Sequence, residues 1–91
     1  MKLSSEQVQR VEQRIDGQVV PDSHPLSPQL QREFGDHTFF LNPDGLTIVE
    51  RSPVDRQVGE VVKLAGWTSS AHTELEPEVP EPMPVAIQLE S

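Results

Sequence analysis

The fold is decided by the stretch HTFFLNPDGLTIVER, residues 37–51. Two apolar runs, residues 37–41 and 46–51, flank the sequence Asn-Pro-Asp-Gly. In this corner the proline presets the φ angle of a tight turn and the aspartate can hydrogen-bond its own backbone, while Gly45 can adopt the left-handed conformation that lets the second run turn back. The stretch therefore predicts a β-hairpin with strands at about 37–41 and 46–51.

Two further segments have the composition of strands. Residues 60–66 are rich in β-branched and aliphatic side chains and close at Trp67, so we expect them to form a third antiparallel strand. In residues 85–89, large apolar side chains alternate with alanine and glutamine, a period of two. We expect this segment to add a fourth strand at an edge of the same sheet. The alternatives are a free tail and a strand added to the sheet of a partner.

A first helix is predicted over residues 4–16. Ser4 and Gln7 have the spacing of a capping box, and Leu3 and Val8 can pack across the first turn. Apolar side chains then recur at helical spacing, and the glycine that follows is a suitable C-terminal stop. The helix is therefore expected to present one narrow apolar stripe to the sheet.

A second, shorter helix is predicted over residues 27–34. Ser27 is expected to cap it, with Pro28 at the first helical position and Gly35 as the stop. Two turns of helix are not stable alone in water, so this helix must dock on the hairpin. The predicted class is α+β, a small antiparallel sheet of three or four strands with both helices packed on one face.

The chain of 91 residues is long enough for one small domain with a thin core. We expect the domain to span residues 1–67. Residues 68–84 are a mixture of proline and glutamate and predict an extended acidic linker, which leaves residues 85–91 as a C-terminal strand or a free tail. No cysteine is present, so disulfides and thiolate metal sites are excluded, and the polar N-terminus favours a cytoplasmic protein.

The formal net charge is −8 and is unevenly distributed. Five glutamates follow Trp67 without any lysine or arginine, so the residues up to Trp67 carry −3. Negative charge repels phosphate groups, so neither nucleic acid nor an anionic membrane is an expected partner. A basic protein is the electrostatically favoured partner, although such a charge can also serve solubility alone.

The sequence contains few groups that could perform chemistry. The three histidines are His24, His37 and His72, and of these only His37 directly follows an acid, Asp36. There is no Gly-x-Ser-x-Gly turn for a nucleophilic serine and no glycine-rich phosphate loop. We therefore expect no enzyme activity, no cofactor and no metal site. The alternative is a small metal-binding or hydrolytic protein that uses His37 and Asp36.

The preferred interpretation is a small non-enzymatic interaction or accessory module. A sheet edge, a hairpin that is apolar on both faces and an acidic tail would meet another protein or a second copy of the chain. The candidate interaction surface consists of four apolar residues: Trp67, Val85, Ile87 and Leu89. A further alternative is an acidic mimic that occupies a nucleic-acid-binding site on a basic protein.

Overall fold

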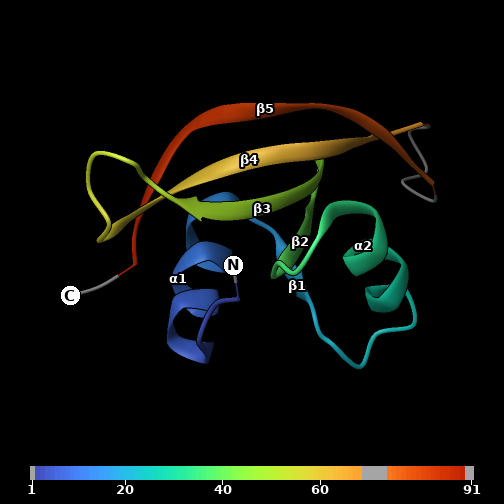
Figure 1. Ribbon diagram of the computed structural model, residues 1–91, viewed down its shortest axis with the longest axis horizontal. Coiled ribbons are helices and arrows are strands. Elements are labelled where there is room, and N and C mark those ends of the chain that lie inside the picture. The colour runs from blue at the N-terminus through green and yellow to red at the C-terminus, as the bar shows by residue number, and fades with distance from the viewer. Residues whose placement is uncertain (1, 69–73, 90–91) are drawn as a thin grey trace.

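The computed structural model describes residues 2–68 and 74–89. These residues form two helices and five strands, in the order α1 (Ser5–Ile15), β1 (Gln18–Val20), α2 (Ser27–Phe34), β2 (Phe39–Asn42), β3 (Gly45–Arg51), β4 (Val58–Trp67) and β5 (Leu75–Gln88) (Figure 1). The strands make one antiparallel sheet in which each strand pairs with the next along the chain. The predicted α+β class is therefore confirmed. No helix of the described residues has the length and apolar character needed to cross a membrane.

The predicted hairpin is present as β2 and β3. Asn42 pairs with Gly45 across the corner, and the side-chain oxygen of Asn42 accepts hydrogen bonds from the amides of Asp44 and Gly45, both at 3.0 Å. The bonding side chain is thus Asn42 rather than the predicted Asp44. Gly45 has φ +137°, and a Cβ there would collide with the carbonyl oxygen of Ala65 in β4. Glycine is required for both reasons.

The sheet has five strands where the sequence predicts three or four. Residues 18–20 form the short strand β1, which pairs with β2, in a segment that the sequence analysis leaves without a strand. The predicted strand at 85–89 does pair with the chain's own sheet, but β5 begins at Leu75 and so includes residues for which a linker is predicted. Prolines are tolerated here because β5 lies at the edge of the sheet and needs donors on one side only.

The first helix follows its sequence signals closely. The Ser4 hydroxyl accepts a hydrogen bond from the Gln7 amide at 3.2 Å, and the Gln7 side chain accepts one from the Ser4 amide at 2.9 Å, so the predicted capping box is confirmed. At the other end the left-handed residue is Asp16, with φ +51°, and not the glycine that follows it. A short polar side chain such as aspartate tolerates this conformation better than most.

The second helix differs from prediction at its start. Its cap is Leu26, and no side chain bonds the first turn, so Ser27 is the first helical residue instead of the cap. Ser27 is buried within the first turn, one position after the cap. The predicted stop is confirmed, since Gly35 has φ +95° and donates its amide to the carbonyl of Gln31 at 2.9 Å.

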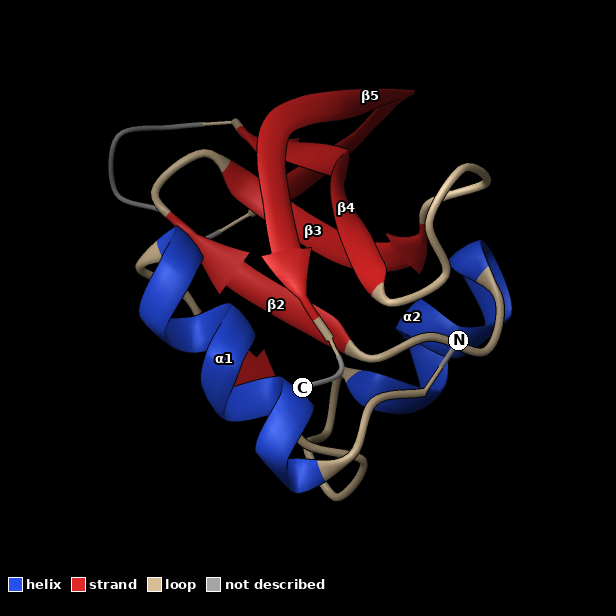
Figure 2. Ribbon diagram, turned by 90° about the vertical axis from the view of Figure 1, so that its left-hand side faces the viewer, coloured by secondary structure: helices blue, strands red, loops and turns tan. Residues whose placement is uncertain are grey.

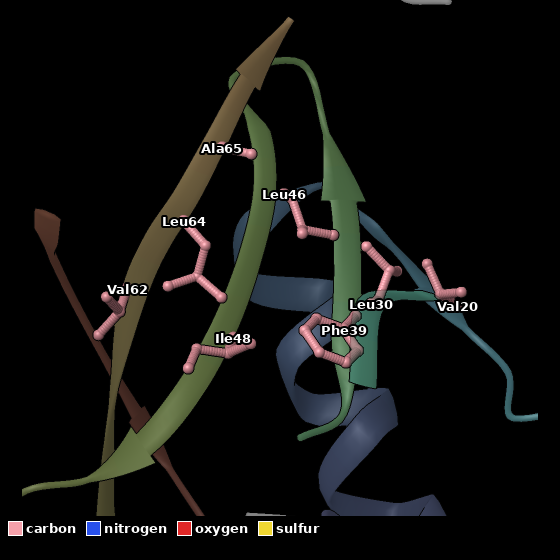
Figure 3. Close-up of a cluster of buried hydrophobic side chains, with 8 residues drawn as sticks. All are labelled: Val20, Leu30, Phe39, Leu46, Ile48, Val62, Leu64 and Ala65. Atoms are coloured by element: carbon pink, nitrogen blue, oxygen red, sulfur yellow. The ribbon is translucent and has the colours of Figure 1, made fainter. Parts of the chain in front are cut away.

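The core is divided into two clusters by the sheet. The α2-side cluster contains Val20, Leu30, Phe39, Leu46, Ile48, Val62, Leu64 and Ala65 (Figure 3), and the α1-side cluster contains Val11, Phe40, Val49, Val61, Ile87 and Leu89. Phe39 and Phe40 are neighbours on one strand, so their side chains point to opposite faces. Leu30 of α2 belongs to the cluster of Phe39, and Val11 of α1 belongs to the cluster of Phe40.

The helices therefore cover different faces of the sheet, and the prediction that both lie on one face is wrong. Helix α1 packs against β1 and the C-terminal part of β5 (Figure 2). The physical reason is already present in the hairpin. Both of its faces are apolar, and a chain this small covers them by placing one helix on each.

Candidate functional site

An apolar groove lies between α2 and the end of the sheet where β4 finishes and β5 begins. Its volume is about 340 Å³. Three core residues, Leu30, Leu46 and Ala65, form its deepest part, since they are almost fully buried and still line it. The groove is thus a place where the α2-side cluster reaches the surface.

Helix α2 and the residue before it supply one wall of the groove. Leu26, Leu30 and Phe34 are spaced by four residues, which places them on the same side of a helix. Phe34 also packs against Phe39, with ring centroids 6.3 Å apart, so this wall is fixed to the sheet. Leu26 is 43% exposed at the open side of the groove. Water in contact with Leu26 would be released by an apolar occupant.

The strands supply the opposite wall. Trp67 pairs directly with Leu75, and Ala65 with Pro77, and residues opposite each other in an antiparallel pair share a face. All four line the groove. The indole nitrogen of Trp67 donates a hydrogen bond of 2.8 Å to the backbone carbonyl of Asn42. The tryptophan ring is therefore held in place by the hairpin corner, and part of it remains accessible.

The charge around this groove is negative. Glu33 provides the charge among the lining side chains, beside the neutral amide of Gln29. The whole chain carries −8, so a cation approaching the groove is attracted at long range as well. The site accordingly combines an apolar interior with one acidic side chain, Glu33, at its margin.

The structure separates the four residues of the predicted interaction surface. Trp67 lies in the groove and is half-buried. Ile87 and Leu89 are each 3% exposed and belong to the α1-side cluster, with Val85 packed beside them. Ile87 and Leu89 therefore offer no surface to a partner, because α1 covers the face of β5 on which they lie.

Apart from Trp67, none of the residues that line the groove belongs to the predicted interaction surface; Leu26, Phe34, Leu75 and Pro77 are examples. The spacing of Leu26, Leu30 and Phe34 could have indicated an apolar side of α2 that extends beyond the helix start. Nothing local could have indicated Leu75, because its place depends on how β5 pairs with Trp67.

Neither edge of the sheet is well suited to pairing with another strand. At β1, which has three residues, the amide of Val19 already donates to the carboxylate of Glu12 at 3.0 Å, and Pro21 follows directly. At β5, prolines occupy positions 77, 80, 82 and 84 and have no amide hydrogen to donate. Short strands and prolines are features with which proteins block sheet edges. The edge is thus a weaker candidate than the groove.

The Asp36–His37 pair lies at the entrance to β2. The His37 amide donates to the side-chain oxygen of Gln31 at 3.2 Å, and the imidazole packs edge-on against Phe39 at 6.0 Å. Burial of the ring lowers the pKa of His37 below its usual value. The Asp36 carboxylate is 3.7 Å from the ammonium group of Lys2. Local bonding and packing account for where His37 lies.

The other histidines give no convergent site. The ring of His24 accepts a hydrogen bond from the Leu26 amide at 3.1 Å, and His72 lies outside the described residues. Within 2–68 and 74–89, no three histidine or acidic side chains are grouped so that they could hold a metal ion.

Three of the C-terminal acids, Glu76, Glu78 and Glu81, lie on β5. The carboxylate of Glu78 is 3.3 Å from the ammonium group of Lys63 and lies over Gly66. Gly66 alternates with Ala65 and Trp67 along β4, so these acids lie on the face of the sheet opposite the groove. They form a second anionic surface, separate from the groove.

Comparisons of the chain with models of protein families, with curated proteins and with solved structures found no match. The geometry of the molecule is thus the basis for a function. Among the described residues, the groove combines an apolar interior, an anchored tryptophan and an accessible opening.

Proposed function

We propose that this protein is a small non-enzymatic interaction module that binds a segment of another protein in the groove. One observation carries the proposal: Leu26, Trp67 and Leu75 remain partly accessible around an apolar groove, while the domain covers the rest of its apolar hairpin with its own helices. Apolar side chains gathered at one accessible place are typical of a binding surface.

The partner segment that fits best carries one large apolar residue between lysines or arginines. The apolar residue would enter the groove against Leu30 and Ala65, and a cation beside it would face Glu33. Fully burying a side chain such as leucine contributes about 1.5–3 kcal/mol. Because association itself has an entropic cost that one buried leucine does not exceed, a short segment should bind weakly, with a dissociation constant of about 1 mM or higher. The interaction is therefore expected to be transient or to be strengthened by contacts elsewhere.

Fluorescence of Trp67, the single tryptophan, reports on the groove directly. We would titrate the full chain with ten-residue peptides that carry one leucine flanked by lysines. The expected result is a saturable change in emission, because the leucine displaces water from beside the indole. Peptides with glutamates in place of the lysines should bind more weakly, and peptides with serine in place of the leucine should not bind.

A variant of the groove supplies the control. Leu26→Glu places a carboxylate at an exposed position on the groove wall, so it should abolish binding without unfolding the protein. Val54→Glu makes the same change at a residue that is 92% exposed and does not line the groove, and it should leave binding unaltered. Equal binding by Leu26→Glu and the parent chain would refute the proposal.

A further inference from the structure

The middle of β5 is an exposed, proline-rich strand. Residues 76–84 read Glu-Pro-Glu-Val-Pro-Glu-Pro-Met-Pro, and eight of these nine residues are exposed; Met83 is the half-buried exception. Val79 is 86% exposed, one of three large apolar side chains of the described residues that stand open to solvent. The strand follows the outer border of the sheet (Figure 1). The segment thus presents prolines, one valine and three glutamates to solvent.

The pairing of β5 with β4 is irregular at two places. From Lys63 to Ala65 the chain of β4 advances two residues, whereas the paired residues of β5 advance four, from Glu81 to Pro77. The same mismatch occurs opposite Val61. Residues 78–80 and 83–85 are thus not in regular register, and Val79 and Pro80 stand in the first bulge. Bulges turn side chains away from the ladder.

The backbone of this segment is also restricted before any partner arrives. Each proline fixes φ near −65°, and each residue that precedes a proline is held in an extended conformation. Four prolines in positions 77–84 thus hold this part of β5 extended. Pro77 and Pro80 are three residues apart, which is the spacing of a Pro-x-x-Pro segment. Pairing to β4 fixes the segment further, so little conformational entropy remains to be lost on binding.

We infer that residues 77–84 are a ligand that a proline-recognising domain of another protein binds. Such domains bind Pro-x-x-Pro segments in grooves lined by aromatic side chains. The acids Glu76, Glu78 and Glu81 interleave with the prolines, so the matching domain carries lysine or arginine beside its aromatic groove. This surface is distinct from the groove of the proposed function, with which it shares Pro77.

A different role for the prolines would be to block the sheet edge and nothing more. The two roles differ in what the exposed Val79 and the acids do: blocking an edge requires the missing amide hydrogens of the prolines, whereas recognition also requires Val79 and the interleaved charge. Substitutions that keep the prolines therefore separate the two roles.

The experiment is a binding screen of the full chain against isolated SH3 and WW domains, with surface plasmon resonance as the readout. We expect binding by domains that have basic residues beside the aromatic groove. The combined change Val79→Ala and Pro80→Ala should weaken it about tenfold or more. The combined change Glu78→Lys and Glu81→Lys, which keeps every proline, should weaken it as well. Pro53→Ala, at an exposed proline outside the sheet, and Leu26→Glu, in the groove, should have no effect.

The outcomes are separable. If no domain binds the parent chain, or if the Val79/Pro80 and Glu78/Glu81 variants bind as tightly as the parent chain, the inference is overturned and the prolines serve the edge alone. If Leu26→Glu abolishes this binding together with that of the leucine peptides, the two surfaces are one site and the inference of a separate ligand fails. Circular dichroism of each variant verifies that a loss of binding is not a loss of fold.

Discussion

At the scale of single residues, the hairpin corner depends on Gly45. Its φ of +137° and the closeness of the Ala65 carbonyl both exclude a side chain. We expect Gly45→Val to destabilise the protein by about 3 kcal/mol or more, which is a large part of the stability of a small domain. Urea unfolding measures the change. Asp44→Ala is the matched control in the same corner; its side chain is exposed, and the cost should be within about 0.5 kcal/mol.

The burial of His37 leads to a prediction about how the free energy of unfolding depends on pH. Burial favours the neutral ring, so the folded pKa of His37 lies below its unfolded value of about 6.5. The unfolded chain therefore binds a proton first, and the free energy of unfolding falls as the pH drops from above the unfolded pKa towards the folded one. The difference in stability between the parent chain and His37→Gln should change over this range. A difference that is constant from pH 8 to pH 5 would contradict the assigned burial.

At the scale of elements, the sequence was informative where the signal is local. The Asn42–Gly45 corner and the capping box of Ser4 and Gln7 are each formed by residues close together in the chain, and both are confirmed. Strand β1 could not be predicted, because three residues carry little pattern and their pairing with β2 depends on a contact distant in sequence. The proline content of β5 favours a linker, because composition does not show that the segment can pair with β4 as the edge strand of the sheet.

The prolines of the edge strand β5 lead to a prediction about self-association. Prolines at positions 80, 82 and 84 remove amide donors from β5, so restoring those donors should expose a pairing edge. The combined change Pro80→Thr, Pro82→Val and Pro84→Thr is expected to increase concentration-dependent self-association, measured by light scattering after gel filtration. Pro53→Val adds the same kind of residue outside the sheet and should not. A triple variant that elutes with the same mass as the parent at every concentration would show that these prolines do not protect the edge.

At the scale of the whole molecule, the two core clusters explain what the sequence could not. Periodicity identifies which side chains of a helix face inwards. It does not identify which face of a sheet the helix covers, and this is why the prediction that both helices lie on one face is wrong. The groove is also a property of the assembled fold. The pairing of β4 with β5 places Leu75 beside Trp67, and the packing of α2 on the sheet adds Leu26.

The α1-side cluster is completed by residues from the C-terminal part of the chain, which is also a property of the whole fold. Ile87 is 3% exposed among Val11, Phe40 and Leu89, although it is close to the end of the chain. Ile87→Ala should therefore cost about 2–5 kcal/mol, as for other core positions. Val79→Ala, on the exposed part of the same strand, should cost less than about 0.5 kcal/mol. Equal melting temperatures for the two variants would mean that β5 does not complete the core.

The proposed function requires that the groove between α2 and the β4–β5 end binds an apolar residue of a basic segment. Chemical-shift mapping of the ¹⁵N-labelled chain with the lysine-flanked leucine peptide tests it most directly. We expect shifts at the Trp67 indole N–H and at the amides of Leu26, Phe34 and Leu75, with little change in α1. An unchanged Trp67 signal at saturating peptide, or shifts centred on α1, would contradict it.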